Sequence, residues 1–470
     1  MTAIWWIRRD LRVDDNVALD TATELGHGTV IPLFVLDPAI QSSRYHGAAQ
    51  RRAQFLFAGL RALDQDLRTR GAWLLVRRGS PLEVLRQLSA EVGATAVVAE
   101  RDHSPFAKRR DGAVARALPL HLVGSPAVRI PGDVTKDDGR PYAVFGAFRR
   151  AWMAQPPITQ RDILQAPALL NAGAAAPVSE PPPSHPEVPG FPAGPHEALH
   201  RLDAFTRGTD APILRYHDDR DRMDLEGTST LSPYLRFGML SARTAAERAT
   251  GLIANGAGTG ASRWLDELLW RDFYMHILDA APEVLRIEFN SGLRGISWRN
   301  DPAEIEAWRT GLTGYPVVDA AMRQLATTGW MHNRARMIVA SFLVKHLLVD
   351  WRIGESWFME QLIDGDPASN NGGWQWVAGT GTDAVPYFRV FNPVLQGKKF
   401  DPDGSFIRRW VPELAAVPSR FIHEPWALTP IEQASLGVRI GETYPAPIVD
   451  LGAGRDRALE AFSAARERMR

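Results

Sequence analysis

The sequence predicts an α/β N-terminal domain on a doubly wound parallel sheet and an all-α C-terminal domain, joined by a long linker. Up to about residue 125, short β-branched or aromatic runs alternate with helical patterns. Residues 171–195 are rich in proline, alanine and glycine, which favours an extended connector. From about residue 196 the strand signal disappears. We therefore place the domains at residues 1–130 and 196–470 and the linker at 131–195.

The N-terminal part contains five expected strands. They are Ile4–Ile7, Val30–Leu36, Trp73–Val76, Ala96–Ala99 and His121–Val123, with helical patterns that include Ala48–Leu67 and Pro81–Val92. Strands that alternate with helices form a parallel sheet. No G-x-G-x-x-G follows the first strand, so the usual dinucleotide-binding motif is missing. A ligand of this domain would bind at the carboxyl ends of the strands through other residues.

The C-terminal part is expected to consist of helices. The longest patterns are Arg263–Leu278, Val317–Thr327, Asn333–Leu348 and Trp357–Ile363. Ser232 is expected to cap a short helix whose first residue is Pro233.

Composition limits the classes of function. A chain of 470 residues with zero formal net charge has no bulk attraction to nucleic acid, so any polyanion site must be a local cluster. The absence of cysteine excludes disulfides, thiol nucleophiles, Fe–S clusters and cysteine zinc sites. No run approaches the roughly 20 apolar residues of a membrane helix. The start turns charged after seven residues, so we expect no signal peptide and a cytoplasmic protein.

The segment DGDPASNNGGWQW, residues 364–376, is the most informative stretch of the chain. It combines two carboxylates, two amides, a Gly-Gly turn and two tryptophans. Amides can hydrogen-bond a heteroaromatic edge without carrying charge, and Gly-Gly lets the backbone approach a bulky group. The alternative interpretation is a well-packed junction between helix and loop with core tryptophans.

Two helical segments carry further candidates. Residues 264–278 place Glu267, Trp270, Arg271 and Tyr274 on one face, as either a surface ion pair or a ligand-facing group. Residues 329–348 bring His332, Asn333, Arg336 and Met337 within two turns of a helix whose end must be buried. A core histidine is the favoured interpretation of His332. Buried arginines need partners, and Asp364 and Asp366 are the obvious candidates.

Two other segments are candidate phosphate-binding sites. Thr228, Ser229 and Ser232 precede a helix N-terminus, which is either an anion site or a plain capping cluster. Residues 388–410 interleave Arg and Lys with aromatic side chains, which indicates either contact with a nucleic-acid backbone or a solvated face.

Together, in this order, these segments resemble the DNA photolyase/cryptochrome family, and most closely its class I cyclobutane pyrimidine dimer photolyases. The resemblance runs from RRDLRVDDNVAL (Arg8–Leu19) to FIRRWVPEL (Phe406–Leu414). It implies an antenna domain, a linker and a helical domain that holds non-covalent FAD, fully reduced in the active form. It also implies light-driven repair of UV-damaged DNA, with an electron passing from excited reduced FAD to a flipped-out dimer.

The resemblance assigns the cofactor contacts residue by residue. They are Tyr216, Thr228, Ser229, Leu231, Ser232, Trp264, Arg271, Asn333, Arg336, Asp364, Asp366 and Asn370. Asn370 is expected to face flavin N5, where a neutral amide can accept a hydrogen bond from N5–H. Arg336 paired with Asp364 would place a cation near the ring.

The resemblance also assigns an electron path and a substrate pocket. Trp374, Trp351 and Trp298 match the family's tryptophan chain, although core packing explains any one of them alone. Glu267, Trp270, Met337 and Trp376 match the dimer pocket, with the indoles as walls and Glu267 as a hydrogen-bonding group. Arg220, Arg334, Lys398 and the basic stretch 389–409 are expected to hold the DNA backbone.

Two alternatives and the antenna complete the predictions. A (6-4) photolyase typically has two adjacent histidines where this chain has His332–Asn333, and a cryptochrome photoreceptor usually has a long tail and a lost pocket. The segments Glu100–Asp111 and Asp37–Leu56 resemble proteins that carry 8-hydroxy-5-deazaflavin, with FMN, methenyltetrahydrofolate or an empty site as alternatives. We expect a monomer without a metal site.

Overall fold

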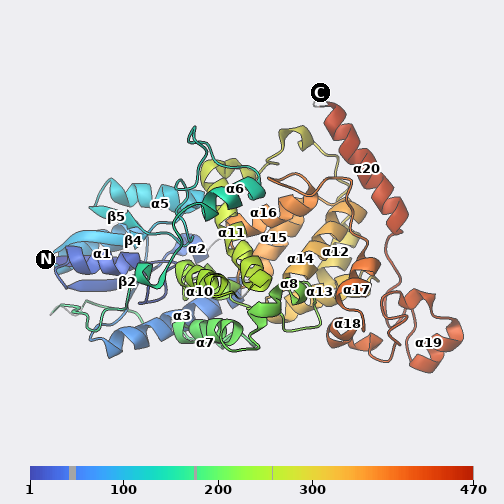
Figure 1. Cartoon of the computed structure of the whole chain (residues 1–470), viewed down its shortest axis with the longest axis horizontal. Helices are drawn as coiled ribbons and strands as arrows, with labels where there is room; N and C mark the ends of the chain where they lie inside the picture. The colour runs from blue at the N-terminus through green and yellow to red at the C-terminus, as the bar shows by residue number, and fades with distance from the viewer. Residues whose placement is uncertain (42–48, 174–176, 257, 469–470) are drawn as a thin grey trace. The chain divides into compact units, whose positions relative to one another are not determined.

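The structure is a computed structural model that describes residues 1–41, 49–173, 177–256 and 258–468. It divides into two compact units, each described by itself (Figure 1). Unit 1 contains Met1–His217, Thr228–Pro282 and Ile363–Ala368; unit 2 contains Asp218–Gly227, Glu283–Leu362 and Ser369–Arg470. These units do not follow the predicted limits at residues 130 and 195, which stay predictions. Part of the predicted antenna segment, residues 42–48, lies outside the described residues.

A parallel sheet organises the N-terminal half of unit 1. Its strands are β1 (Thr2–Ile7), β2 (Val30–Leu36), β3 (Leu75–Arg78), β4 (Ala94–Glu100) and β5 (Leu120–Val123), in the order β3-β2-β1-β4-β5. Every neighbouring pair is parallel, for example with Ile4 opposite Ile31 and Val97. The predicted doubly wound sheet is therefore confirmed, with β3 slightly later in the chain than expected.

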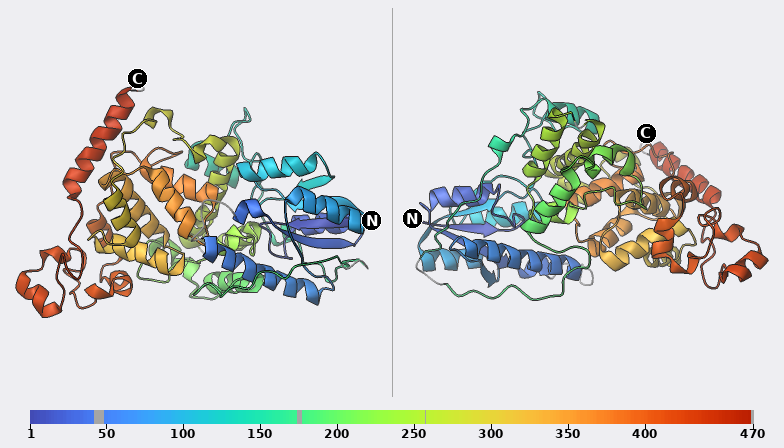
Figure 2. Two further views of the ribbon diagram at one scale, coloured as in Figure 1. Left: turned by 180° about the vertical axis from the view of Figure 1, so that it is seen from behind. Right: turned by 60° about the horizontal axis from the view of Figure 1, so that its bottom comes forward.

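Helices α1 (Val17–Leu25), α4 (Pro81–Val92) and α5 (Pro105–Ala115) pack against this sheet, and the other helices of unit 1 pack mainly on one another. Those other helices are α2 (Pro38–Gln41), α3 (Ala49–Thr69), α6 (Phe145–Met153), α7 (Pro195–Thr206), α9 (Ser232–Arg236), α10 (Ala242–Ala254) and α11 (Gly258–Ala280), with α8 (Tyr216–Asp219) at the unit limit. Apolar side chains of α4 and α5 pack on one face of the sheet. Residues 177–194 run without helix or strand, as the composition predicted (Figure 2).

Unit 2 is helical in the residues that the structure describes. Its longer helices are α12 (Pro302–Thr310), α13 (Pro316–Thr328), α14 (Asn333–Ser341), the π-helical η5 (Phe342–His346), α15 (Trp351–Gln361), α16 (Pro367–Ala378, from Ser369 on), α17 (Pro393–Phe400), α18 (Ser405–Trp410), α19 (Pro430–Leu436) and α20 (Leu451–Arg468). One large hydrophobic cluster forms its core and includes Trp308, Trp351, Trp374 and Phe462. The predicted all-α C-terminal part is confirmed.

Two local expectations were wrong, and one expected helix forms with a change of geometry. The helix expected over Asn333–Leu348 changes to π-helical geometry at Phe342. Gly372 and Gly373 form no turn, because α16 continues through both to Ala378. Ser232 is the first residue of α9 and not its cap, since Leu231 takes the cap position without a side-chain hydrogen bond.

A buried lysine lies in η5. The ammonium of Lys345 donates to the carbonyl oxygens of Ala378 (2.7 Å) and Tyr387 (3.3 Å) and lies 3.7 Å from the ring centroid of Phe462. Burial lowers the pKa of Lys345 from 10.5 to about 7. In the unfolded chain the lysine keeps its ordinary pKa, so between pH 7 and pH 10 the unfolded state binds more protons than the folded state.

Stability is therefore expected to rise with pH through this window, by at most about 1.4 kcal/mol per pH unit from this residue. Lys345→Met should remove that rise, because methionine fills the same apolar space and does not titrate. Denaturant midpoints at pH 7.0 and pH 9.5 for both proteins test this. Equal pH dependence in the two proteins would contradict it.

Candidate active site

The predicted phosphate segment lies beside the first acidic residue of DGDPASNNGGWQW in unit 1. The hydroxyl of Ser232 donates to Asp364 Oδ2 at 2.6 Å, and Trp264 Nε1 donates to Ser229 Oγ at 3.3 Å. Between them Thr230 adopts φ 50°, a backbone conformation that non-glycine residues rarely adopt and that clusters at ligand sites. Three segments distant in the sequence are thus brought together, and the strained Thr230 was not predicted.

The remaining predicted contacts of unit 1 surround this segment. Leu231 is buried at the cap of α9, Thr228 is half-buried, and buried Tyr216 packs edge-on against Phe205 with ring centroids 5.8 Å apart. Phe205 also packs against Trp264 at 5.4 Å. Tyr216 and Trp264 therefore flank one phenylalanine.

Asp366 has a partner that the sequence interpretation missed. Arg9, which follows β1, donates to Asp366 Oδ2 at 2.7 Å, and Arg236 lies 3.9 Å from the same oxygen. Arg9 also lies 3.6 Å from Asp102, so it joins the carboxyl ends of the strands to the segment at 363–368. The expected pairing of arginines of residues 329–348 with Asp364 and Asp366 stays a prediction beside these contacts.

The predicted face of α11 forms as expected. Glu267, Trp270, Arg271 and Tyr274 are all half-buried, whereas Leu265, Leu268, Leu269 and Phe273 are buried. Phe145 of α6 stacks on the indole of Trp270 with ring centroids 3.7 Å apart and an interplanar angle of 7°, so one face of this predicted dimer wall is covered. Phe145 is a further residue of this region that the sequence interpretation missed.

Arg271 contacts two backbone carbonyl groups of unit 1. It donates to the carbonyl oxygens of Pro126 (2.5 Å) and Leu235 (3.1 Å), and burial lowers its pKa. Two of its donors therefore hold backbone segments, and its contact with a cofactor stays a prediction.

Asn370 of α16 is held in one orientation in unit 2. Its Nδ2 donates to both the backbone oxygen and the Oε1 of Glu355, each at 3.0 Å, which leaves Oδ1 as an acceptor. One turn further along α16, a Cβ added at Gly373 would meet no described heavy atom within 4 Å. A single face of α16 thus combines an oriented amide with free space.

The start of α14 carries the other predicted polar groups of unit 2. Asn333 Nδ2 lies 3.9 Å from the sulfur of Met337, and Arg336 Nε donates to Met331 O at 2.8 Å. His332 caps the helix by accepting from Arg334 N at 3.1 Å, and burial lowers its pKa to about 4. His332 is thus buried as expected, but its Nε2 is buried without a hydrogen-bond partner among the described residues, so the interpretation as a core histidine stays a prediction.

The three predicted electron carriers belong to the hydrophobic cluster of unit 2. Trp374 and Trp351 are fully buried, and Trp298 is half-buried at the cluster margin. Trp351 Nε1 donates to Glu288 Oε1 at 3.3 Å, and Trp374 packs edge-on against Trp308 with centroids 6.1 Å apart. Glu288 was not predicted. Its carboxylate also pairs with Arg352 at 2.8 Å, and the Arg352 guanidinium lies 4.8 Å from the Trp351 ring centroid, so opposite charges flank this indole.

The predicted DNA-binding cations have acidic neighbours. Arg334 forms a two-point pair with Asp221 (2.7 and 3.2 Å), and Arg220 lies 3.7 Å from the same carboxylate. Lys398 pairs with Glu424. A DNA phosphate could bind these cations only by displacing the Asp221 or Glu424 carboxylate or by binding beside it. Half-buried Trp376 packs at the edge of the core, which leaves part of its ring accessible.

Each unit, taken by itself, offers groups of a kind that can hold part of a flavin dinucleotide. Unit 1 offers hydroxyls at a strained turn beside an indole, and unit 2 offers an oriented amide acceptor on an open helix face. No three His, Asp or Glu side chains of the described residues are arranged to hold a metal ion.

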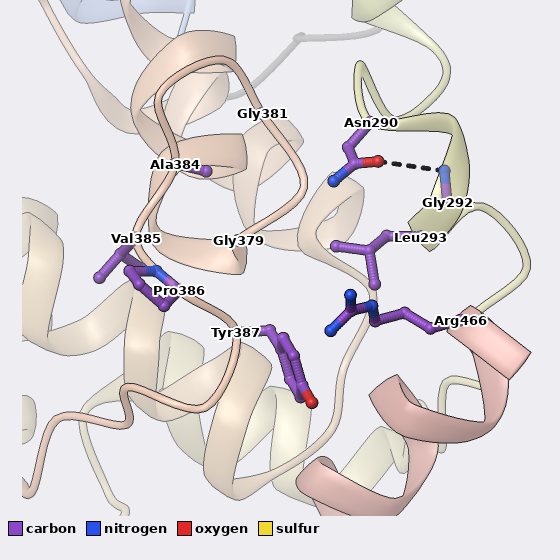
Figure 3. Close-up of a pocket in the computed structure, with 10 residues that line it drawn as sticks. All are labelled: Asn290, Gly292, Leu293, Gly379, Gly381, Ala384, Val385, Pro386, Tyr387 and Arg466. Atoms are coloured by element: carbon purple, nitrogen blue, oxygen red, sulfur yellow. Dashed lines mark hydrogen bonds between the residues drawn. The ribbon is translucent and has the colours of Figure 1, made fainter. Parts of the chain in front are cut away.

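A cavity of about 420 Å³ lies elsewhere in unit 2 (Figure 3). Its lining includes Asn290, Leu293, Tyr387 and Arg466, with the guanidinium of Arg466 lying 5.2 Å from the centre of the Tyr387 ring. No predicted site residue lines this cavity.

Comparison with known proteins identifies the family. The family models described as "DNA photolyase" and "FAD binding domain of DNA photolyase" match residues 3–168 and 264–464. A deoxyribodipyrimidine photo-lyase of Agrobacterium fabrum is 40% identical over 481 residues, which covers 99% of this chain and 98% of the relative. The chain belongs to the DNA photolyase family.

Solved structures of photolyase relatives agree with this. A class III photolyase from Agrobacterium tumefaciens has a TM-score of 0.91 at 39% identity and covers 99% of this chain and 98% of its own. A Synechocystis cryptochrome has a TM-score of 0.87 at 30% identity, with 98% and 99% covered. Cryptochrome is thus the more distant alternative. Class I within the photolyase family stays a prediction, since the first of these structures belongs to class III.

Proposed function

We propose that this protein is a light-driven deoxyribodipyrimidine photo-lyase that splits cyclobutane pyrimidine dimers in UV-damaged DNA. The observation that carries the proposal is the face of α11, where the carboxyl of Glu267 lies one turn from the indole of Trp270 and both are half-buried. A photoreceptor that has lost its substrate pocket has no need of this pair.

The cofactor is FAD, which supplies an excited-state electron when it is bound and reduced. Thr228, Ser229 and Ser232 would hold its phosphates and ribose, with Tyr216, Leu231 and Trp264 shaping the pocket. We assign Arg271, Asn333, Arg336, Asp364 and Asp366 to the rest of that pocket. Asn370 would accept a hydrogen bond through Oδ1, since its Nδ2 is engaged with Glu355.

The substrate would be a dimer flipped out of the duplex. Trp270 and Trp376 would form apolar walls that exclude water, and Met337 would complete them. Glu267 would hydrogen-bond one pyrimidine and steady the charge that develops on it. Arg220, Arg334 and Lys398 would hold the kinked backbone by exchanging carboxylate partners for phosphates.

Electrons that restore the reduced cofactor would pass through Trp298, Trp351 and Trp374. The order of burial supports this route, because Trp351 and Trp374 lie inside the hydrophobic cluster of unit 2 and Trp298 lies at its margin. The half-buried Trp298 is the member that an external donor could reach.

The antenna chromophore we propose is 8-hydroxy-5-deazaflavin, held by the N-terminal domain. We also propose a monomer that acts on DNA in the cytoplasm. None of the helices that the structure describes is both long and apolar enough to span a bilayer.

Repair of an oligonucleotide with one thymine cyclobutane dimer tests the function. Chemically reduced enzyme should restore the thymines under blue light, with no reaction in the dark and none on a (6-4) lesion. Absence of repair by protein that holds reduced FAD would favour the photoreceptor alternative.

Glu267→Ala is expected to lower repair by about 10-fold to 100-fold, because a hydrogen bond to a charged group contributes roughly 1.5–3 kcal/mol. FAD content, measured by absorbance, should stay unchanged. Glu247→Ala on α10 is the matched control, since Glu247 is a half-buried glutamate on a neighbouring helix of the same unit. Loss of FAD in Glu267→Ala would show that this carboxyl belongs to the cofactor pocket.

A further inference from the structure

We infer that Lys345 is a positioning residue for damaged DNA, because it holds the loop of residues 379–391 in the conformation that presents Phe388 and Arg389 to the duplex. The inference rests on the proposed function, since it deepens the DNA contact assigned to the basic stretch 389–409. Lys345 was not among the predicted site residues.

The 379–391 loop begins where α16 ends and has neither helix nor strand. Figure 3 shows its first part, from Gly379 to Tyr387. The backbone is left-handed at Gly379 (φ 83°) and at Asp383 (φ 46°). Such a conformation is costly for an aspartate, so contacts elsewhere must hold the loop in place.

Lys345 of η5 holds the first part of this loop. Its fully buried Nζ donates at 2.7 Å to the oxygen of Ala378, the last residue of α16, and at 3.3 Å to the oxygen of Tyr387. Carbonyl oxygens at a helix end lack intrahelical donors, so Lys345 supplies one. The Tyr387 ring also stacks on Phe462 of α20, with centroids 6.0 Å apart and an interplanar angle of 4°. One side chain thus joins two points that are nine positions apart in the chain.

The same turn of helix holds the end of the loop. Phe391 N donates to the hydroxyl of Ser341 at 3.3 Å, and His346 Nε2 donates to Phe391 O at 3.0 Å. Ser341 and His346 are both buried, and η5 between them is π-helical. Such turns are rare and frequently occur at functional sites. Residues 388–390 are therefore held on both sides by one short segment of the core.

The residues between these two anchors face solvent. Phe388 is 62% exposed, and Arg389 beside it is also exposed, with its N–H donating to Pro386 O at 2.8 Å in a turn. An aromatic ring and a guanidinium side by side can stack on a base and bind a phosphate. A loop that is already in place avoids the cost of ordering it when DNA binds.

Lys345→Met removes the donor and keeps an apolar side chain that fills the space. Affinity for a duplex with one thymine cyclobutane dimer, measured in the dark, should fall about fivefold to tenfold, because it scales with the fraction of molecules whose loop is in place. The slope of log K against log salt should become shallower by about 1, the contribution of one phosphate contact. Hydrogen exchange of the loop amides in the holoenzyme should become faster.

Two backgrounds separate positioning from a general loss of structure. In protein with Phe388→Ala and Arg389→Ala, Lys345→Met should weaken binding no further, because the groups that it positions are absent. In the Arg409→Ala background its full effect should remain. Arg409 is the matched control, since it is an exposed arginine of the same basic stretch that lies on α18, outside the loop.

Equal effects of Lys345→Met in the two backgrounds, or an unchanged affinity, would overturn the inference. Repair of the same duplex by the wild-type protein under blue light distinguishes this from a failure of the proposed function. If the wild type repairs the dimer and the effects are equal, only the role of Lys345 is rejected. If the wild type holds reduced FAD and does not repair, the proposed function itself is wrong.

Discussion

Trp298→Phe should reduce photoreduction of oxidised FAD to near the background rate while pre-reduced enzyme still repairs dimers. Phenylalanine preserves the edge-on packing of ring 298 against Phe462, whose centroid lies 5.9 Å away, but it is far harder to oxidise than an indole. The fold and the substrate pocket should therefore persist while the electron path loses its outer member. Absorbance under blue light with an external donor gives the rate of photoreduction.

Trp426→Phe is the matched control. Trp426 is a half-buried tryptophan of the same unit that packs edge-on against Tyr315 with centroids 5.4 Å apart, and it belongs to no predicted path. Its substitution should leave photoreduction unchanged. If Trp298→Phe photoreduces as fast as this control, the assignment of the chain is wrong.

Gly354→Ala is expected to destabilise the protein by about 1–3 kcal/mol and to displace Trp374. A Cβ at residue 354 would lie 2.1 Å from Trp374 Cη2 and 2.7 Å from Leu343 Cδ2, distances that a packed core cannot keep. Helix propensity alone predicts that Gly354→Ala would instead stabilise the protein, since alanine is favoured over glycine in a helix by roughly 1 kcal/mol. The sign of the change in unfolding free energy therefore decides which effect dominates.

Gly251→Ala on α10 supplies the comparison. Its added Cβ would have Glu247 Oε1 at 3.9 Å as its nearest contact, so the propensity effect should act alone and stabilise. Denaturant unfolding of both variants, together with transient absorption for the Gly354→Ala holoenzyme, tests the two claims. An unchanged or higher stability for Gly354→Ala would show that Trp374 has room to move.

The patterns that repeat along the chain were predictable. The strands of the parallel sheet appear as buried apolar runs, and the α11 face containing Glu267 and Trp270 follows from helical spacing alone. Gly372 and Gly373 misled the prediction, because glycine weakens a helix only by a modest amount and tertiary packing can override that preference.

Contacts between distant residues were not predictable. Arg9 and Asp366 are 357 positions apart, and Glu288 and Trp351 are 63 apart, so no local periodicity connects them. The same holds for Phe145 and Trp270, which belong to different helices. Such pairs depend on how elements pack, and a single sequence contains no direct record of that packing. The resemblance to a family supplied residue roles but not these supporting partners.

The discontinuity of unit 1 has a consequence for synthesis on the ribosome. Its last segment, Ile363–Ala368, follows the second stretch of unit 2, Glu283–Leu362, and Asp366 in it pairs with Arg9 of the first strand region. Arg9 can meet Asp102 early, but it gains its 2.7 Å contact with Asp366 only after most of the polypeptide has emerged, which leaves nascent chains without this contact and open to chaperones and proteases during that interval. Translation products that stop before Ile363 should be degraded faster than products that extend past Ala368.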